Sequence, residues 1–461
     1  MSVSDKFTNA VRKVVGSDWV QWNKSFLSFY SQDALGVGSF PDLVVIPGST
    51  KEIASIARLC NQEGVPLVVR GGGTGYTGGA VPTHGGVLLS MERLNRILEI
   101  DEASLLAVVE PNVITVDLKS EAEQVGLYYP PDPASLARSA LGGNVAECAG
   151  GPNAFKYGTT KRYVLGLEAV LPTGEIIHTG SKAVKNVVGY DLTQLLVGSE
   201  GTLAIITKII LRLIPKPTTQ RSLVAFFPGV SEAVQAVTSL IALRVVPAAI
   251  ELVDSASLEA VRNYLGHSPV PNSVDTILII EVDGMLAEVE EAISMTADAM
   301  VTAGAINVVR ASNEVEREKI WTVRRELSPA LKATGLLKIN HDVVVPRGRI
   351  PELFKIIESL RKKYGLFIAC FGHAGDGNIH VNIMVDRADE NERKNAGIAV
   401  KDLFFGVVSL EGSISGEHGI GFQKSAYLGI ELGSSEIALM KRIKVAFDPL
   451  GILNPGKIFP E

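Results

Sequence analysis

The sequence predicts an α+β fold with two different parts, and three observations support this fold class. Glycine is concentrated in two segments of the first half, residues 71–79 and 130–160. Residues 214–220 (IPKPTTQ), with two prolines, follow and are typical of a linker. Beyond this linker the glycine clusters stop, and short strand-like runs alternate with longer helical runs, which indicates an α+β domain.

Composition restricts the class of protein. The chain has 461 residues, enough for two or three domains, and 46% hydrophobic with 20% charged residues indicate a globular chain. The formal net charge of −6 argues against a nucleic-acid-binding protein, which normally carries a basic patch. The three cysteines, Cys60, Cys148 and Cys370, are far apart. We therefore expect a reducing compartment, with neither a disulfide framework nor a cysteine-rich metal cluster.

No segment predicts secretion or a membrane span. The N-terminal segment contains no apolar stretch of signal-peptide length, and Asp5 comes early in it. The most apolar run, residues 202–215 (TLAIITKIILRLIP), contains Lys208 and Arg212 and is shorter than the about 18 residues of a spanning helix. We expect a buried strand there and a cytoplasmic protein, with attachment to the inner membrane through a partner as an open alternative.

The first half begins with a strand, a helix and a strand within residues 41–69. Thr50 is expected to cap the helix and Gly64 to end it, as glycine commonly does just past a helix. Further elements are expected in chain order: strands at 86–90 and 105–111, a helix at 115–126, two strands at 163–180 and a strand at 202–215.

Residues 73–78 carry the spacing G-x-G-x-x-G directly after an apolar run, which is the dinucleotide fingerprint of a Rossmann fold. That fold requires an uninterrupted helix after the glycines. Here Pro82 and the glycine pair at 85–86 arrive within one or two turns and exclude such a helix. We therefore predict a different fold around this loop.

The same loop has the composition of an anion-binding site. Six of the nine residues 71–79 are glycine, so successive N–H groups can line a concavity. Thr74 and Thr77 add hydroxyl donors, and Arg70 adds positive charge. Because so many glycines are entropically costly for a simple turn, we favour a phosphate ligand over an unliganded hairpin.

The second half is predicted to alternate strands and helices: strands at 222–227, 248–254 and 275–284, and helices at 231–243 and 288–304. Residues 378–386 alternate apolar with polar side chains, which predicts a half-buried strand that carries His380 on its polar face. His373 precedes this strand across a tight glycine-containing turn and can fold back beside His380. Two converging imidazoles favour a divalent metal, and Glu417, between glycines in SISGEHGIG, offers a third ligand.

Several motifs together resemble one family. The first half carries, in order, VRGGGTGYTGG (69–79), PPDPAS (130–135), GGNVAECAGGPNAFKYG (142–158) and VGYDLTQLLVGSEGTLAIIT (188–207). With these the chain resembles the vanillyl-alcohol-oxidase and p-cresol-methylhydroxylase family of FAD-binding flavoproteins. The second half resembles the C-terminal part of FAD-linked oxidases through FGHAGDGNIHVN (371–382), SGEHGIG (415–421) and DPLGILNPGKIF (448–459). The subgroup contains glycolate oxidase FAD subunits, D-lactate dehydrogenases and D-2-hydroxyglutarate dehydrogenases.

The resemblance implies the domain organisation. Residues 1–216 are expected to form a two-subdomain FAD-binding domain of the p-cresol-methylhydroxylase (PCMH) type, whose core begins near residue 40. Residues 217–425 are expected to form an α+β substrate or cap domain with an antiparallel sheet. Residues 426–461 are expected to pack back on the FAD-binding domain.

The resemblance also implies how FAD is held, extended between two small α/β subdomains. The residues expected at the cofactor are Arg70, Gly71, Gly72, Gly73, Thr74, Gly75, Gly78, Pro131, Asp132, Ser135, Gly142, Gly143, Asn144, Gly150, Gly151, Gly158, Glu200, Gly201, Ile205, Ile206 and Asn454. No histidine occurs between Arg70 and Ala80, so we expect noncovalent FAD. The pairs 147–148 (Glu-Cys) and 187–188 (Val-Val) depart from the family pattern, so the redox potential of the flavin does not follow from the resemblance.

Catalytic roles follow from the resemblance in the same way. Arg324, the last residue of a W-x-x-R pattern, is expected to grip a substrate carboxylate, and His418 to act as the general base. Arg325 is expected on a solvated helix face. The expected set is His418, Arg324, Lys338 and Asn378 for catalysis, and His373, His380 and Glu417 for a divalent metal, Zn, Fe or Mn.

The sequence thus predicts an FAD-linked dehydrogenase that oxidises a small D-2-hydroxy acid, glycolate or D-lactate, to the 2-oxo acid by metal-assisted hydride transfer to flavin N5. The alternatives are a D-2-hydroxyglutarate dehydrogenase, a non-catalytic FAD electron-relay subunit, and a flavin-independent metallohydrolase. Because the sequence has no cysteine set for an iron–sulfur cluster, we expect electrons to leave to a partner. That partner is an iron–sulfur subunit, a quinone or an electron-transfer flavoprotein, and we expect an oligomer or hetero-complex.

Overall fold

The computed structural model describes residues 3–266, 271 and 274–460. The chain forms two compact units: the first comprises Met1–Gly151, Gly158–Lys216 and Glu417–Glu461, and the second comprises Pro152–Tyr157 and Pro217–Gly416. The units change after Lys216, within the linker that the sequence indicates. Residues 417–425, which we expected in the cap domain, belong to the first unit together with the C-terminal segment.

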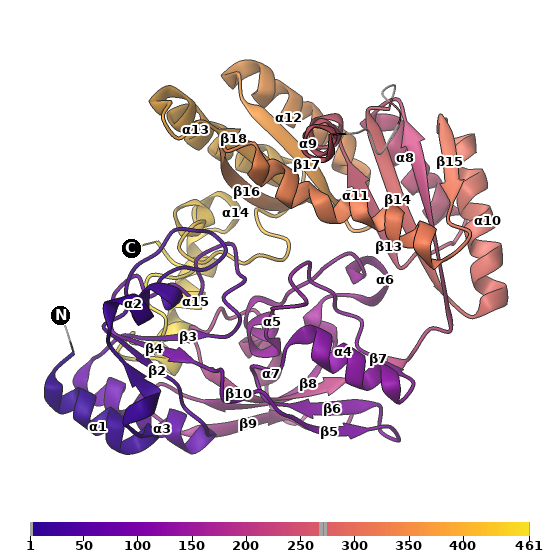
Figure 1. Cartoon of the computed structure of the whole chain (residues 1–461). Helices are drawn as coiled ribbons and strands as arrows, with labels where there is room; N and C mark the ends of the chain where they lie inside the picture. Colours follow the sequence, from indigo (N-terminus) through magenta and orange to yellow (C-terminus); the bar gives the residue numbers. More distant parts are fainter. Residues whose placement is uncertain (1–2, 267–270, 272–273, 461) are drawn as a thin grey trace. The chain divides into compact units, whose positions relative to one another are not determined.

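The first unit contains a sheet with the strand order β1-β2-β4-β3, of which Figure 1 labels β2, β3 and β4. Its strands are β1 Val20–Gln21, β2 Leu43–Val45, β3 Leu67–Arg70 and β4 Val87–Ser90. The pairs β2–β4 and β3–β4 are parallel, and β1 is antiparallel to β2. Two helices share the apolar core of this sheet, α1 (Asp5–Val15) and α3 (Thr50–Glu63).

The start of α3 differs from the expectation. We expected Thr50 to cap this helix, but Ser49 is the cap, and its hydroxyl accepts the N–H of Glu52 at 3.3 Å. The Thr50 hydroxyl instead donates to Glu168 at 2.8 Å, so it is engaged outside the helix. Gly64 ends the helix in the left-handed region, with φ 63°, as expected.

The glycine-rich residues 71–79 lie in the loop that connects two neighbouring parallel strands, β3 and β4. None of residues 71–86 in this loop is helical. The prediction that this loop does not open a Rossmann helix is therefore confirmed. The C-terminal segment lies beside β3, because the N–H of Leu67 donates to Ile452 O and the N–H of Asn454 donates to Leu67 O, each at 2.8 Å.

The second sheet of the first unit is antiparallel, with the order β5-β6-β10-β8-β9. Its strands are β5 Ile97–Asp101, β6 Leu106–Val109, β8 Val164–Val170, β9 Ile176–Gly180 and β10 Ile205–Arg212. A two-stranded ladder joins β7 (Leu127–Tyr128) and β11 (Ile214–Pro215). The other helices of this unit are α2 Lys24–Leu27, α4 Thr115–Gln124, α5 Leu141–Glu147, α7 Leu192–Leu196, α14 Leu428–Glu431 and α15 Ser434–Phe447.

The second unit contains an antiparallel sheet of seven strands among its described residues, in the order β15-β12-β14-β13-β17-β18-β16. These strands are β12 Thr219–Phe227, β13 Ala249–Val253, β14 Thr276–Gly284, β15 Asn307–Arg310, β16 Leu337–Val344, β17 Phe367–His373 and β18 Asn378–Val385. The prediction of an α+β cap with an antiparallel sheet is confirmed.

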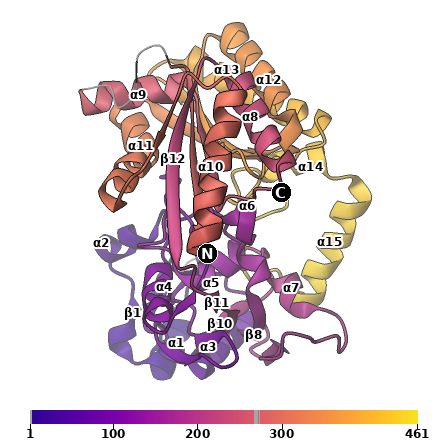
Figure 2. The ribbon, with the colours of Figure 1, turned by 90° about the vertical axis from the view of Figure 1, so that its right-hand side faces the viewer.

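Helices cover both faces of this sheet (Figure 2). α9 (Ser255–Leu265) and α11 (Glu314–Ala333) pack on one face, around Phe371 of β17. α8 (Val230–Ala242) packs against α10 and α12 on the other side. The remaining helices of this unit are α6 Ala154–Tyr157, α10 Leu286–Thr302, α12 Ile350–Tyr364 and α13 Glu390–Ser409. Within the described ranges, the chain has no helix both long and apolar enough to cross a membrane.

One buried ion pair fastens α11 to the sheet. Arg317 donates to Glu281 of β14 at 2.7 Å, and Glu281 also accepts from the indole N–H of Trp321 at 2.9 Å. Only 9% of the Glu281 side chain and 20% of the Arg317 side chain are exposed. A charge placed there depends on its partner, because an unpaired buried carboxylate is costly.

We predict that Arg317→Met destabilises the protein. Breaking a buried ion pair costs about 3–5 kcal/mol, and the partial exposure of Arg317 reduces this to about 1–3 kcal/mol. Guanidinium unfolding followed by circular dichroism measures the change. Arg325→Met is the matched control on the same helix, because its side chain is 53% exposed and pairs with Glu318 at the surface. Equal unfolding midpoints for the two variants would contradict the prediction.

Candidate active site

The expected cofactor loop lies in the first unit between β3 and β4, directly after Arg70. Arg70 Nη1 donates to Gln32 O at 2.9 Å, and its guanidinium lies 5.9 Å from the ring of Tyr30. Gly73 has φ 63°, and a Cβ there would clash with the Arg70 guanidinium. Glycine at position 73 therefore permits the turn, and it leaves room for the Arg70 side chain to lie against the backbone of this residue.

Several glycines of the cofactor motifs serve close packing of the chain on itself. A Cβ on Gly72 would clash with Arg138 O, and one on Gly142 would lie 2.6 Å from Pro111 Cβ. Part of the glycine content is thus explained without a ligand.

Other positions face open space. A Cβ on Gly143, in α5, would meet no heavy atom within 4 Å, and one on Gly75 would meet only Asp33 Oδ2 at 3.7 Å. Because these two positions have room that packing does not use, the residues present fit a flat ligand that approaches the backbone.

The other expected cofactor residues all lie in the first unit, but some side chains have structural roles. Asn144 Nδ2 donates to the Thr115 hydroxyl at 2.7 Å, and Ile205 belongs to the apolar core. Asn454 Nδ2 donates to Gly79 O and to Glu200 O at 2.9 and 2.7 Å. The remainder are Gly71, Thr74, Gly78, Pro131, Asp132, Ser135, Gly150, Gly151, Gly158, Gly201 and Ile206.

The two departures from the family pattern lie in different settings. Cys148 caps α5 in the left-handed region, with φ 56°, and its Sγ lies 3.3 Å from the Thr159 hydroxyl. Val187 and Val188 are 96% and 91% exposed, so neither side chain packs in the core.

Glu200 positions the segment that carries His418. Its carboxylate accepts the N–H groups of Ile420 and Gly421, both at 2.7 Å. Burial raises the pKa of Glu200, and these two N–H groups oppose the rise. The Thr77 hydroxyl donates to His418 O at 3.1 Å, and the ring centroids of Tyr76 and His418 lie 5.3 Å apart. The first glycine loop and the expected general base are therefore tied together within one unit.

The histidine hairpin lies in the second unit. The turn 374–377 joins β17 to β18, and the rings of His373 and His380 have centroids 5.3 Å apart. His373 is 3% and His380 6% exposed. The expectation of a half-buried strand is wrong, because every residue of β18 is buried. Sequence alternation could not reveal this, because helices cover both faces of the sheet.

Glu251 on β13 was not foreseen, and it contacts two of the expected site residues. It stands directly opposite His373 in the β13–β17 ladder, and its Oε1 contacts His373 Nδ1. Its Oε2 accepts from Arg324 Nε at 2.5 Å. Burial alone would raise the pKa of Glu251, but His373 and Arg324 lower it to about 2. The only sequence signal was a glutamate in the middle of an apolar strand, AIELV.

Glu417 directly follows the last residue of the second unit. Gly416 N–H donates to Asp342 Oδ2 at 2.8 Å, and Asp342 stands opposite His380 in the β16–β18 ladder. One ligand atom each from His373, His380 and Glu417 lie within 4.8 Å of one another. Two imidazoles and a carboxylate are a donor set that suits a divalent transition metal.

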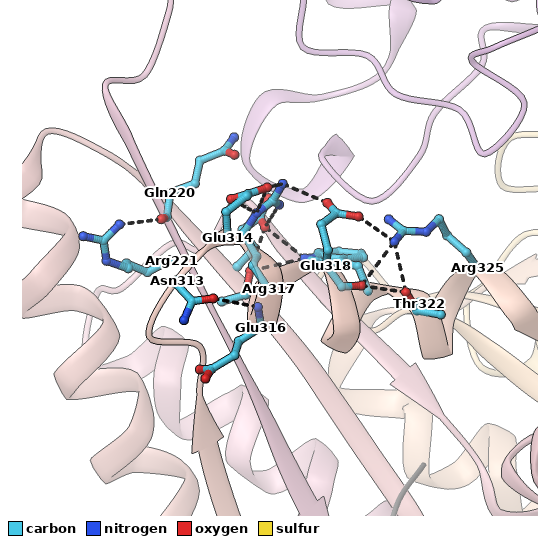
Figure 3. Close-up of polar contacts among 12 residues, drawn as sticks. Gln220, Arg221, Asn313, Glu314, Glu316, Arg317, Glu318, Thr322 and Arg325 are labelled. Atoms are coloured by element: carbon cyan, nitrogen blue, oxygen red, sulfur yellow. Dashed lines mark hydrogen bonds and ion pairs between the residues drawn. The ribbon is translucent and has the colours of Figure 1, made fainter. Parts of the chain in front are cut away.

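The other expected catalytic residues lie on or beside the same sheet. Lys338 of β16 donates to the Ser328 hydroxyl at 2.9 Å, and burial lowers its pKa. Asn378 Nδ2 donates to Val343 O at 3.2 Å. Arg325 joins an outward ion-pair network with Glu318, which Figure 3 shows beside Arg317, and is therefore on a solvated helix face as expected.

Comparison with known families defines the class. Residues 216–458 match the family "FAD linked oxidases, C-terminal domain", and residues 41–180 match "FAD binding domain". The chain therefore belongs to the FAD-linked oxidase family, which confirms the resemblance seen in the motifs. It is an FAD-linked oxidoreductase that acts on CH–OH donors.

Among curated proteins, the chain is similar to a glycolate oxidase subunit and to a D-lactate dehydrogenase. The chain is 42% identical over 431 residues to glycolate oxidase subunit GlcD of Bacillus subtilis (strain 168), covering 93% of this chain and 92% of that protein. It is 36% identical over 425 residues to D-lactate dehydrogenase of Anaerostipes hadrus, covering 91% and 89%. The solved structure of p-cresol methylhydroxylase with substrate bound is similar in fold, with a TM-score of 0.82 and 20% identity over 98% of this chain and 96% of that one.

We predict that Glu200→Gln loosens residues 420–421. Glutamine keeps a single acceptor oxygen, so one of the two buried N–H groups loses a charge-assisted bond of about 1.5–3 kcal/mol. Hydrogen exchange of that amide should accelerate about ten- to a hundredfold. Glu110→Gln is the control, since Glu110 is equally buried in this unit but binds Arg96 instead. Unchanged exchange at both amides would refute the positioning role of Glu200.

Proposed function

We propose that the protein oxidises a small D-2-hydroxy acid, glycolate or D-lactate, to the corresponding 2-oxo acid. The observation that carries this proposal is the grouping of buried imidazoles with a guanidinium around one sheet face of the second unit. The relatives named glycolate oxidase subunit and D-lactate dehydrogenase support the substrate class. D-2-hydroxyglutarate is the alternative substrate, and Lys338 on β16 offers an amino group as a hydrogen-bond donor for its second carboxylate.

FAD supplies the two-electron acceptor for this reaction when it is bound. The loop 71–79 and the neighbourhood of Gly143 would hold it in the first unit. Residues 71–79 offer no nucleophilic histidine or cysteine for a tether, so we propose noncovalent binding. Asn454 and Glu200 would keep the loop in place, because they bind its backbone and the segment that follows His418.

A divalent metal, Zn, Fe or Mn, supplies Lewis acidity that lowers the pKa of a hydroxyl group when it is bound. His373, His380 and Glu417 would hold it. These residues are two neutral nitrogen donors and one carboxylate, which leave coordination positions for a substrate.

Arg324 and His418 are the residues of this chain that would act on the substrate. Because Arg324 Nε is bound to Glu251, a substrate carboxylate would be met by the two terminal nitrogens of the guanidinium. The imidazole of His418 would act as the general base and accept the proton of the substrate hydroxyl group. Lys338 and Asn378 would line the same sheet face.

We also propose an electron-accepting partner. The three cysteines, Cys60, Cys148 and Cys370, are far apart and do not form the closely spaced cysteine set of an iron–sulfur cluster, so the reduced cofactor would pass its electrons outside this chain. An iron–sulfur subunit, a quinone or an electron-transfer flavoprotein fits this role. The relative from Bacillus subtilis carries the word subunit in its name, which supports a hetero-complex.

The substrate proposal is tested by anaerobic bleaching of the flavin in the purified protein. We predict rapid bleaching by glycolate or D-lactate and none by L-lactate, because a fixed carboxylate clamp and base distinguish the two hands of the α-carbon. Fastest bleaching by D-2-hydroxyglutarate would favour the alternative. A flavin that none of these acids reduces would contradict the proposed function.

The metal proposal is tested by His373→Ala and Glu417→Ala. We predict that each variant loses bound divalent metal and turnover yet retains FAD, because the loop 71–79 contributes neither ligand. Elemental analysis and the flavin absorption spectrum measure the two contents. His178→Ala is the control, since His178 is exposed on β9. Full metal occupancy with normal turnover in His373→Ala would remove the metal from the mechanism.

A further inference from the structure

We infer that Glu251 is a positioning residue whose single carboxylate holds both the Arg324 guanidinium and the His373 imidazole in their working orientations. This inference rests on the proposed function, because it takes His373 as a metal ligand and Arg324 as the substrate clamp.

Both oxygens of Glu251 are committed. Oε2 accepts from Arg324 Nε at 2.5 Å, and Oε1 contacts His373 Nδ1. The Glu251 side chain is 0% exposed, so water does not compete for these oxygens. A carboxylate buried in this way is retained only when both oxygens have donors.

The contact with His373 selects the nitrogen that could bind a metal. With Nδ1 directed at the carboxylate, Nε2 is the ring nitrogen placed to coordinate. Metal-binding histidines usually donate their other N–H to a carboxylate, which fixes the ring and raises its basicity. The backbone pairing of β13 with β17 thus places the Glu251 carboxylate beside His373, where it can fix the orientation of the imidazole ring.

The contact with Arg324 fixes the other half of the site. The guanidinium carbon lies 4.8 Å from the ring centroid of Phe371, so the ring covers a face of the guanidinium while Glu251 holds its Nε edge. The Arg324 guanidinium is therefore held at its Nε edge by Glu251 and on one face by Phe371. Its two terminal nitrogens are oriented by these contacts and are not themselves bound to Glu251.

A second glutamate provides an internal comparison. Arg317 lies seven residues before Arg324 on α11, about two helical turns, and pairs with Glu281 of β14. Glu281 contacts Ser222 and Trp321 rather than a histidine. Two arginines of α11 thus pair with buried glutamates of the sheet, but only the glutamate of the second pair, Glu251, contacts an expected metal ligand.

The test compares Glu251→Gln with Glu281→Gln in the FAD-loaded protein. Glutamine offers one acceptor oxygen and an amide that repels an N–H donor, so it satisfies His373 or Arg324 but not both. The dissociation constant of Zn²⁺, measured by chelator competition, should rise about ten- to a hundredfold in Glu251→Gln. It should stay unchanged in Glu281→Gln, whereas both variants lose unfolding stability.

Kinetics supply a second readout. If Glu251 orients Arg324, Glu251→Gln at saturating Zn²⁺ should also raise the KM for the hydroxy acid, and Arg324→Lys should lower kcat/KM about ten- to a hundredfold. A merely structural Glu251 would change the unfolding midpoint and leave the KM and the Zn²⁺ affinity of the folded fraction intact. Should Glu251→Gln fail to fold, Glu251→Asp keeps the charge but is too short to reach both partners, and it should fold with weakened Zn²⁺ binding.

The outcomes separate this inference from the proposed function. Zn²⁺ binding that is equal in wild type, Glu251→Gln and Glu251→Asp would overturn the positioning role and leave the metal site standing. A wild-type protein that does not bind Zn²⁺, Fe²⁺ or Mn²⁺ would overturn the proposed metal site and the positioning role with it.

Discussion

A carboxylate removed from water needs hydrogen-bond donors on both of its oxygens, and this requirement organises the functional residues within each unit. In the first unit Glu200 receives two backbone N–H groups from the segment that follows His418. In the second unit Glu251 receives a guanidinium and contacts an imidazole. Glu200 therefore anchors a segment that lies 220 residues further along the chain, and Glu251 joins Arg324 to His373.

Strand register determines which residues of the second unit meet. Antiparallel pairing places Glu251 opposite His373 and Asp342 opposite His380. Residues opposite one another share a face of the sheet, so the pairing of β13, β17, β18 and β16 gathers these polar side chains on one face. A shift by one residue would send these side chains to the other face. The backbone hydrogen bonds of the sheet therefore determine the relative positions of Glu251, His373, His380 and Asp342.

Glycine has two uses in the first unit, and they are easily confused in a sequence. Gly72 and Gly142 are needed because neighbouring chain segments approach too closely for a side chain. Gly143 and Gly75 have space beside them, which fits a ligand. A pattern of glycines therefore indicates close backbone approach, but whether the neighbour is protein or cofactor depends on the packing around each position.

The sequence by itself determined the family, the α+β class and most of the elements, because these depend on local periodicity, on turn residues and on motifs several residues long. It excluded a Rossmann helix after residues 71–79 from Pro82 and the glycine pair at 85–86. It also placed His373 near His380, since a short hairpin forces them together. Only the tertiary structure decided that β18 is buried on both faces, that Ser49 rather than Thr50 caps α3, and that Arg324 is bound to Glu251. These features depend on contacts between residues far apart in the chain, which no local pattern encodes, and on burial that is set by helices packed from other segments.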